Sequence, residues 1–511
     1  MRKLCRVLFS RYTLCSLIIL LEVFLAVFIV VNGAKSFLIV SAVSVVISLV
    51  AFFNILLKDT TPEYKITWIV LILLLPPFGA LIYALFYQRK MSRREALLVR
   101  GTIRELTAEG LRERNFSDIA EESHSAAGKA RAIMNDDPIA QIYRNTSSVY
   151  FPTGEELFEA LTLDISRAKK YIFLEYFIIE DGVLWDRIHA LLREKASEGL
   201  DVRLLYDDVG CMKTLPPYYE MELRREGIRA YRFARVNLKV SSAHHNRDHR
   251  KICIIDGVFA YTGGVNIADE YINEKSRFGY WKDGGVRVSG NAVEGLLKLF
   301  LASFDFTSRT ISDYQTLLGT VGQAENPDGG YYLPFGSGPA PIYRRPVGKN
   351  AFLNLINQAE RYVYITTPYL IIDYELTEAL RCAALRGVEV EIITPGIPDK
   401  KLVNIMTRSA YPFLIEAGVR IYEYTPGFIH EKTVLCDDLY AVIGTINFDY
   451  RSLVHHFECA VWMYKSPTVI TAKEEFCKTR EISRRVDGRR AKLTFLEKTL
   501  RAAIKLFAPL L

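Results

Sequence analysis

The chain of 511 residues repeats part of its own pattern at a long interval. Three short segments resemble three later segments, in the same order, at offsets of 191, 188 and 191 residues. The pairs are 170–175 with 361–366, 199–203 with 387–391, and 227–231 with 418–422. Buried-strand patterns alternate with helical ones around them, which is typical of an α/β fold. We therefore predict two duplicated α/β halves that can each supply half of one site.

One polar motif, His-x-Lys-x4-Asp, occurs once in each half. In both copies Lys follows the histidine at +2, Asp at +7 and Asn at +17. The copies are His249, Lys251, Asp256 and Asn266, and His430, Lys432, Asp437 and Asn447. The two histidines are 181 residues apart, close to the offset of the repeat. A lone His-x-Lys is common on structural strands, but two complete copies inside a duplication indicate a functional site, in which we expect the His, Lys and Asp of each copy to be catalytic.

The spacing has a chemical interpretation. In a strand, residues i and i+2 point to one face, so each His and Lys project together. Two such units facing each other would place two imidazoles, two ammonium groups and two amides around one pocket. The lysines and asparagines would bind the non-bridging oxygens of a phosphodiester. One histidine would attack phosphorus and the other would protonate the leaving alcohol.

The N-terminal part is strongly apolar, with three apolar runs at 12–31, 37–57 and 66–87. The first two are long enough to cross a bilayer, whereas Pro76-Pro77 must kink or break the third. We expect two or three transmembrane helices, with an orientation that the basic flanks leave open. Residues 1–100 carry twelve Lys and Arg against four Asp and Glu, so the remaining chain is nearly neutral. This distribution fits an anionic membrane surface and argues against nucleic acid as a partner.

These patterns divide the chain into six parts. They are a membrane region at 1–90, a helix-prone connector at 91–145, a first half at 146–320, a linker loop at 321–341, a second half at 342–488, and an amphipathic helix at 489–511. The connector is expected on the membrane surface or against the globular body. The last helix could lie on a membrane or dock on the protein.

The eight cysteines are scattered through the sequence without a Cys-x-x-Cys pair or zinc-like spacing. We expect reduced thiols in a cytoplasmic domain, and no metal or organic cofactor.

The motif residues resemble the phospholipase D superfamily, and most closely the bacterial cardiolipin synthases. The resemblance covers nearly the whole chain, including Thr367–Tyr369, Arg247–Lys251, Asn447–Ser452 and Leu75–Gly79. It implies two α/β/α sandwich halves that form one site. It also implies His249 as the nucleophile, through a phosphatidyl-histidine intermediate, and His430 as the general acid and then the base. The two-fold arrangement alone does not choose between the histidines.

The same family places a carboxylate on the strand after each motif to orient the histidine. Asp283 and Glu458 match these positions, although Asp283 needs a longer loop after His249 than Glu458 needs after His430. One departure is His456, which stands before Phe457 where the family pattern has an asparagine.

The resemblance implies a cardiolipin synthase, which transfers a phosphatidyl group from one phosphatidylglycerol to another and releases glycerol. Its partners would be phosphatidylglycerol, other anionic phospholipids and the membrane. It would be a multi-pass protein of the bacterial plasma membrane, with its catalytic domain in the cytoplasm. The alternatives are a hydrolytic phospholipase D, a nuclease of the same superfamily, or a non-catalytic membrane protein that binds anionic lipid. The second substrate and the oligomeric state stay open.

Overall fold

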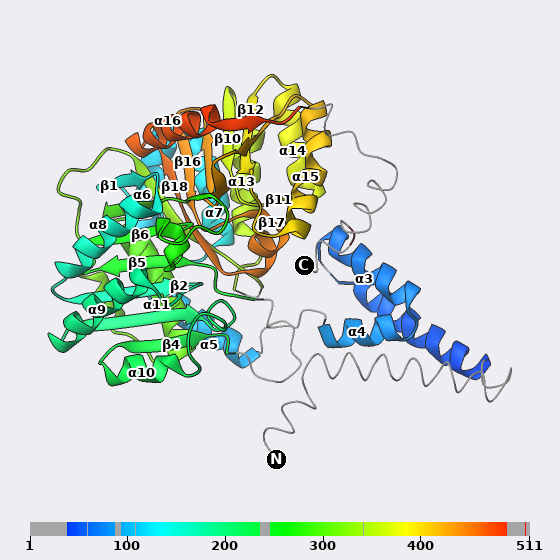
Figure 1. The fold of residues 1–511 in the computed structure, drawn as a ribbon, viewed down its shortest axis with the longest axis horizontal. Helices are drawn as coiled ribbons and strands as arrows, with labels where there is room; N and C mark the ends of the chain where they lie inside the picture. The colour runs from blue at the N-terminus through cyan, green and yellow to red at the C-terminus, as the bar shows by residue number, and fades with distance from the viewer. Residues whose placement is uncertain are drawn as a thin grey trace, which may run out of the picture. The chain divides into compact units, whose positions relative to one another are not determined.

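The computed structural model describes residues 38–58, 60–86, 93–107, 109–235, 246–340, 342–487 and Leu506 (Figure 1). These residues separate into two compact units. One unit lies between residues 93 and 487, and the other comprises the helices between residues 38 and 86 together with Leu506.

The first half forms a seven-stranded sheet in the order β1-β8-β6-β5-β2-β3-β4. The neighbours β2, β3 and β4 are parallel, and all other pairs are antiparallel. The strands are β1 (Thr146–Phe151), β2 (Tyr171–Tyr176), β3 (Asp201–Asp207), β4 (Arg229–Phe233), β5 (Lys251–Ile255), β6 (Phe259–Gly263) and β8 (Gly285–Gly290). The helices between them are α8 (Gly154–Ser166), α9 (Val183–Ser197) and α10 (Tyr219–Arg225).

The second half repeats this sheet in the order β9-β18-β16-β15-β10-β12-β13, with β19 added beyond β13. The directions of the strands also repeat. The strands are β9 (Tyr331–Ser337), β10 (Tyr362–Thr366), β12 (Glu389–Pro395), β13 (Arg420–Tyr424), β15 (Thr433–Cys436), β16 (Tyr440–Gly444), β18 (Glu458–Tyr464) and β19 (Ser483–Arg485). The helices are α13 (Val347–Asn357), α14 (Tyr374–Leu385), α15 (Lys401–Glu416) and α16 (Pro467–Glu481). The predicted duplication of an α/β half is confirmed.

The expected linker loop at 321–341 is wrong in its middle, where β9 lies. This buried strand is the counterpart of β1 and pairs with β18. Pro334 and Gly336 make the segment look like a loop in the sequence. β9 tolerates them because it is an edge strand, where a proline without an N–H can face away from the ladder.

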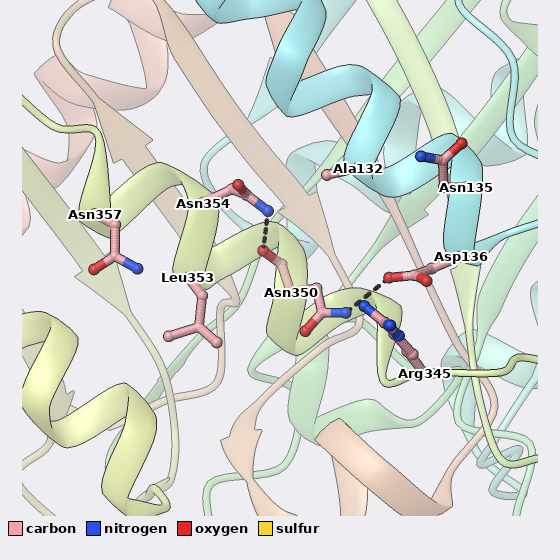
Figure 2. A pocket seen from close by; sticks show the side chains of 8 residues that line it. All are labelled: Ala132, Asn135, Asp136, Arg345, Asn350, Leu353, Asn354 and Asn357. Atoms are coloured by element: carbon pink, nitrogen blue, oxygen red, sulfur yellow. Dashed lines mark hydrogen bonds between the residues drawn. The ribbon is translucent and has the colours of Figure 1, made fainter.

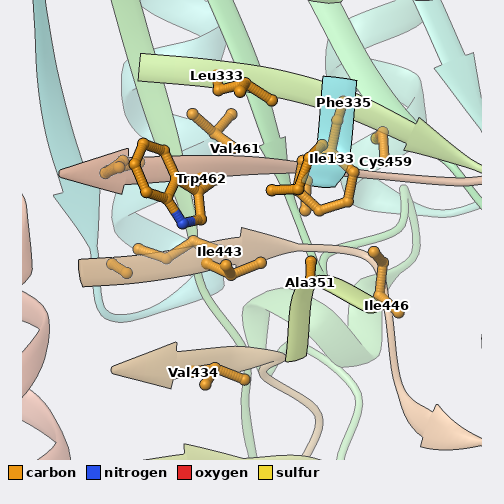
Figure 3. Packing of buried hydrophobic residues seen from close by; sticks show 14 of the residues in the cluster. Ile133, Leu333, Phe335, Ala351, Val434, Ile443, Ile446, Cys459, Val461 and Trp462 are labelled. Carbon is orange, nitrogen blue, oxygen red and sulfur yellow. The ribbon is translucent and has the colours of Figure 1, made fainter. Parts of the chain in front are cut away.

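A continuous hydrophobic core joins the two halves. Helix α11 (Val293–Ser308) packs on the first sheet and also contacts β9 of the second. Figure 3 shows part of the second sheet in this core, where Ile133 of α7 (His124–Asp136) lies near Phe335 of β9. Burial of large apolar side chains on both sheets holds the halves together as one body. A site shared between the halves can therefore be rigid.

Three helices occupy the residues expected as the connector: α5 (Arg93–Leu106), α6 (Glu109–Glu122) and α7. The hydroxyl of Ser123 caps α7 by accepting a hydrogen bond from the N–H of Ala126 at 3.2 Å. Helix α7 packs on α13, and α5 packs on α11. These helices thus lie against the α/β body.

In the second unit, Leu38–Leu56 is a 19-residue helix with a mean hydropathy of 2.5. Within the described residues it is the one helix long and apolar enough to span a bilayer. The third apolar run is broken into α3 (Pro62–Leu74) and α4 (Phe78–Phe86), and neither reaches the roughly 20 residues that a span needs. The first run at 12–31, and the expected C-terminal helix apart from Leu506, lie outside the described residues.

Helix α4 folds back onto α3 at the Pro76-Pro77 break. A Cβ on Gly79 would lie 2.1 Å from the backbone oxygen of Leu71, so only glycine allows this approach. The ring of Tyr83 contacts that of Trp68 edge to face at 5.4 Å. The third run is therefore a short helical pair.

Candidate active site

The backbone next to each motif histidine pairs with a strand of the other half. The N–H of His249 donates to the carbonyl of Phe457 at 2.8 Å, and the N–H of Phe457 donates to the carbonyl of Arg247 at 2.8 Å. This exchange ties the start of the first motif to the residue just before β18. It therefore brings His249 beside Glu458, the first residue of β18.

The second motif is held in the corresponding way. Strand β14 (Gly427–Ile429) pairs in parallel with β7 (Tyr280–Lys282) of the first half. The N–H of His430 then donates to the carbonyl of Lys282 at 2.7 Å. This contact brings His430 beside Asp283.

The carboxylates are consequently exchanged between the halves. Nδ1 of His249 lies 3.0 Å from Oε2 of Glu458, and Nδ1 of His430 lies 2.7 Å from Oδ2 of Asp283. The expectation that each carboxylate serves the motif preceding it is wrong, because the backbone pairing crosses between halves. A carboxylate on Nδ1 fixes the tautomer and leaves Nε2 available for chemistry.

Both motif lysines lie beside their histidines. Lys251 Nζ donates to the carbonyl of His249 at 2.7 Å, and Lys432 Nζ donates to the carbonyl of His430. Lys432 Nζ also lies 2.7 Å from Nδ1 of His430. Both ammonium groups are buried, so they are placed to bind anionic oxygens with little competition from water.

Burial sets the electrostatics of this cluster. It lowers the pKa of His249 and of His430 well below the ordinary value, and the two lysines lower both further. Burial also lowers the pKa of Lys251 to about 8 and that of Lys432 to about 7. The charge of His249 contributes to the lowered pKa of His430, so the two imidazoles interact across the halves.

The carboxylates shift in the opposite direction. Burial raises the pKa of Asp283 to about 7 and that of Glu458 to about 8. Glu458 is further held by hydrogen bonds from the hydroxyls of Ser452 and Thr445. In each pair, burial therefore disfavours the charged form of both the imidazole and the carboxyl group.

The two asparagines differ. Asn266 is already engaged: its Oδ1 accepts from the N–H of Ile178 at 3.1 Å and its Nδ2 donates to the hydroxyl of Tyr271 at 2.6 Å. Oδ1 of Asn447 is buried without a hydrogen-bond partner. Asn447 is therefore the better candidate for contact with a substrate hydroxyl, whereas Asn266 positions its surroundings.

Asp256 does not join the cluster, contrary to the prediction from the motif. Its carboxylate accepts hydrogen bonds from the N–H groups of Lys169, Lys170 and Tyr171 at 2.7, 2.7 and 2.9 Å. It follows β5, so it lies seven residues from His249 along a chain that rises about 3.3 Å per residue. Its role is to hold the start of β2.

Asp437 repeats this arrangement in the second half. It accepts from the N–H groups of Glu360, Arg361 and Tyr362 at 2.9, 2.8 and 2.9 Å, at the start of β10. Its predicted catalytic role is likewise corrected to a structural one.

Substitution of Asp256 by asparagine should therefore destabilise the protein without removing its chemistry. Asparagine keeps the left-handed backbone (φ 57°) but loses the charge that three amides share. The loss of a charge-assisted bond is worth about 1.5–3 kcal/mol, which corresponds to a fall of several degrees in the thermal midpoint. The check compares wild type and variant in two measurements. One is thermal unfolding in detergent, and the other is kcat at a temperature where both proteins are folded. Asp437→Asn is the matched variant, and a selective loss of kcat in either would contradict the structural role.

Aromatic rings surround His430. The ring centres of Tyr271, Trp281 and Phe428 lie 5.6, 5.5 and 5.8 Å from that of its imidazole. Sequence reasoning missed these residues, since aromatic side chains in an α/β fold usually belong to the core. A signal was available: Phe428 lies two residues before His430, and Trp281 two before Asp283, so each shares a strand face with a site residue.

The surroundings of His249 are Phe177 and a further histidine. The ring of Phe177 lies 4.9 Å from that of His249, and the ring of His456 lies 5.6 Å from it. Burial lowers the pKa of His456 well below the ordinary value, and His249 adds to the effect. The departure noted in the sequence at His456 thus falls inside the site.

A separate hollow of 390 Å³ opens between α7 and α13 (Figure 2). Its lining is polar, and Nδ2 of Asn350 donates to Oδ2 of Asp136 at 2.7 Å across it. None of the motif residues lines it. The candidate chemistry therefore stays with the histidine cluster.

Two duplicated α/β halves with exchanged histidine–carboxylate pairs and two buried lysines define a phosphodiester-processing protein of the phospholipase D class. The sequence profile of the family described as "Cardiolipin synthase, PLD-like domain" matches residues 161–276 and 352–480, and that described as "Phospholipase_D-nuclease N-terminal" matches 46–86. The chain belongs to the cardiolipin synthase family of this superfamily, which confirms the resemblance stated from the motifs.

Similar proteins cover most of the chain. A "Cardiolipin synthase" of Alkalihalophilus pseudofirmus is 33% identical over 92% of this chain and 94% of its own length. One of Halalkalibacterium halodurans is 33% identical over 86% and 87%, and an "Uncharacterized protein" of Streptococcus mutans is 39% identical over 87% and 96%. The crystal structure of a phosphatidylserine synthase from Haemophilus influenzae aligns with a TM-score of 0.57 at 15% identity, over 75% of this chain and all of that one. This last likeness supports the fold.

Proposed function

We propose that the protein is a cardiolipin synthase that joins two phosphatidylglycerol molecules and releases glycerol. The observation that carries the proposal is the buried cluster in which each motif histidine is held by a carboxylate of the other half, beside two lysines. Such a cluster supplies a nucleophile, an acid and a cationic phosphate site at once. The inference that the substrate is a phospholipid rests on the relatives, which are named cardiolipin synthases.

The proposed reaction has two displacement steps. In the first, Nε2 of His249 attacks phosphorus and the bond between phosphorus and the oxygen of the headgroup glycerol breaks. His430 gives that oxygen a proton. In the second, His430 takes the proton from a hydroxyl of the second phosphatidylglycerol. The resulting oxygen attacks phosphorus and releases His249. Lys251 and Lys432 stabilise the charge on the non-bridging oxygens in both steps.

The product decides between this function and its relatives. Purified protein is incubated with phosphatidylglycerol labelled in its acyl chains, and the lipids are separated. Labelled cardiolipin with equimolar free glycerol is the expected result. Phosphatidic acid as the main product would instead indicate hydrolysis, and binding without turnover would indicate a non-catalytic lipid-binding protein. Cleavage of single-stranded DNA in place of lipid would indicate a nuclease.

The active form should require a protonated Lys432, whose pKa of about 7 lies well below that of a free lysine because of burial. Since the ammonium form binds phosphate, kcat/KM for phosphatidylglycerol should fall up to about tenfold per pH unit above this pKa. A bound phosphodiester anion raises the lysine pKa, so kcat should fall only at higher pH. Rates measured in neutral detergent micelles over this pH range record the alkaline fall of kcat/KM and that of kcat.

Lys432→Arg is the matched control for this prediction, because its guanidinium stays charged throughout the range. Whatever its absolute rate, its alkaline limb in kcat/KM should move to higher pH. An identical limb in both proteins would assign the titration to another group.

We further propose that the helix Leu38–Leu56 spans the plasma membrane as part of a multi-pass anchor, with the α/β halves in the cytoplasm. Support comes from its hydropathy and from the matching N-terminal family profile. Cys382 is exposed on the α/β body, so a membrane-impermeant thiol reagent should label it in inside-out vesicles and spare it in intact cells. Loss of labelling in Cys382→Ser would show that the reagent reacts at this residue. Labelling of Cys382 in intact cells would mean that the α/β halves lie outside the cytoplasm.

A further inference from the structure

Three side chains at the His249 end of the site form a set that the proposed reaction does not use as a group. Histidine nitrogens of His249 and His456 and a carboxylate oxygen of Glu458 all lie within 4.8 Å of one another. Nδ1 of His456 lies 3.9 Å from Oε1 of Glu458, and Nδ1 of His249 lies 3.0 Å from Oε2. His249 and Glu458 belong to the proposed chemistry, whereas His456 has no part in it.

We propose that His249, His456 and Glu458 form a site for Zn²⁺, or a similar borderline transition-metal ion, whose occupation inhibits the enzyme. Two imidazoles and one carboxylate are a common set of three protein ligands for zinc, with a fourth position left for water. Ligand bonds of 2.0–2.1 Å place tetrahedral ligand atoms about 3.3 Å apart. The separation of 3.0 Å between His249 and Glu458 is close to this value, and the other ligand atoms lie within 4.8 Å of one another.

The surroundings of the three side chains allow an ion to reach them. His249 and Glu458 are buried, whereas His456 is partly exposed, which gives an ion a route from solvent. Backbone pairing at Phe457 already fixes two of the three residues relative to each other.

The positive charges nearby limit the affinity. Lys251 and Lys432 both lower the pKa of His249, so their ammonium forms also repel a divalent cation. Binding would in addition break the hydrogen bond between His249 and Glu458. These costs predict a reversible site that is weaker than a structural zinc site and competes with the phosphodiester, which needs the same lysines charged.

Inhibition rests on the proposed function, since it follows from a metal on the imidazole that attacks phosphorus. The metal site itself rests on geometry alone. An activity assay therefore has to be paired with a direct measurement of binding.

The binding arm uses Co²⁺ as a spectroscopic probe with the purified full-length protein in neutral detergent. Wild type should show visible absorption bands of low-symmetry Co²⁺ that excess Zn²⁺ removes. His456→Asn, which restores the asparagine of the family pattern, should lose these bands, and His456→Gln should behave in the same way. His124→Asn changes an exposed histidine at the start of α7 and should keep them. Equal bands in wild type and both His456 variants, or none in wild type, would overturn the site.

The activity arm compares zinc inhibition of cardiolipin formation, with each protein normalised to its own zinc-free rate. Loss of one ligand should raise the half-inhibitory Zn²⁺ concentration at least about tenfold in His456→Asn. Mg²⁺ at the same concentrations should not inhibit, because it prefers oxygen ligands. If Co²⁺ binds through His456 but zinc leaves the rate unchanged, the site stands and the role of His249 fails. If zinc inhibits all variants equally and Co²⁺ does not bind, the site fails while the proposed function stands.

Discussion

Replacing His249 by alanine should lower the rate of cardiolipin formation by about 10⁴-fold or more, because the nucleophile and its covalent intermediate are lost together. His430→Ala should reduce it by a similar factor with natural phosphatidylglycerol, since glycerol leaves poorly without a proton. Both rates are measured with labelled phosphatidylglycerol in mixed micelles. His124→Ala should match wild type.

A substrate with an activated leaving group separates the two roles. Phosphatidyl-p-nitrophenol releases a stable phenolate that needs no proton, so the general acid becomes dispensable in the first step. His430→Ala should then release a burst of p-nitrophenol and accumulate the phosphatidyl-enzyme, while His249→Ala releases none. The opposite pattern would exchange the roles of the two histidines. A burst from both variants would mean that neither histidine is the nucleophile.

Much of the fold was predictable because duplication is a property of the sequence itself. The offsets near 190 residues place equivalent strands in equivalent positions, and the two sheets follow the same order. The misassigned strand β9 shows the limit. Pro334 and Gly336 suit an edge strand as well as a loop, and only the partner strand β18 distinguishes the two.

The site was predictable as a set of residue types and less so as a set of partners. Motif spacing identified both histidines and lysines, but strand arithmetic already places Asp256 at the far end of β5 from His249. The exchange of carboxylates depends on backbone pairing between residues about 200 positions apart, such as His249 with Phe457. No local pattern encodes such a pairing.

The exchanged carboxylates lead to the second large effect, from Glu458→Gln and Asp283→Asn. Each amide keeps the size of the side chain but no longer fixes the Nδ1–H tautomer of its histidine or stabilises the imidazolium. Both variants should lose about 10²- to 10⁴-fold in cardiolipin formation. Natural substrate alone would not distinguish them.

The activated substrate tests the exchange itself. Because Glu458 holds His249, Glu458→Gln should fail to give the p-nitrophenol burst, as His249→Ala does. Because Asp283 holds His430, Asp283→Asn should keep the burst, as His430→Ala does. Carboxylates that served the histidine of their own half would give the reverse assignment.

A double variant adds a quantitative check: Asp283→Asn with His430→Ala should be little slower than His430→Ala alone, since the carboxylate acts through that imidazole. If the losses in rate from the two substitutions were additive, Asp283 would not act through His430. It would then serve His249, the histidine that precedes it in the sequence.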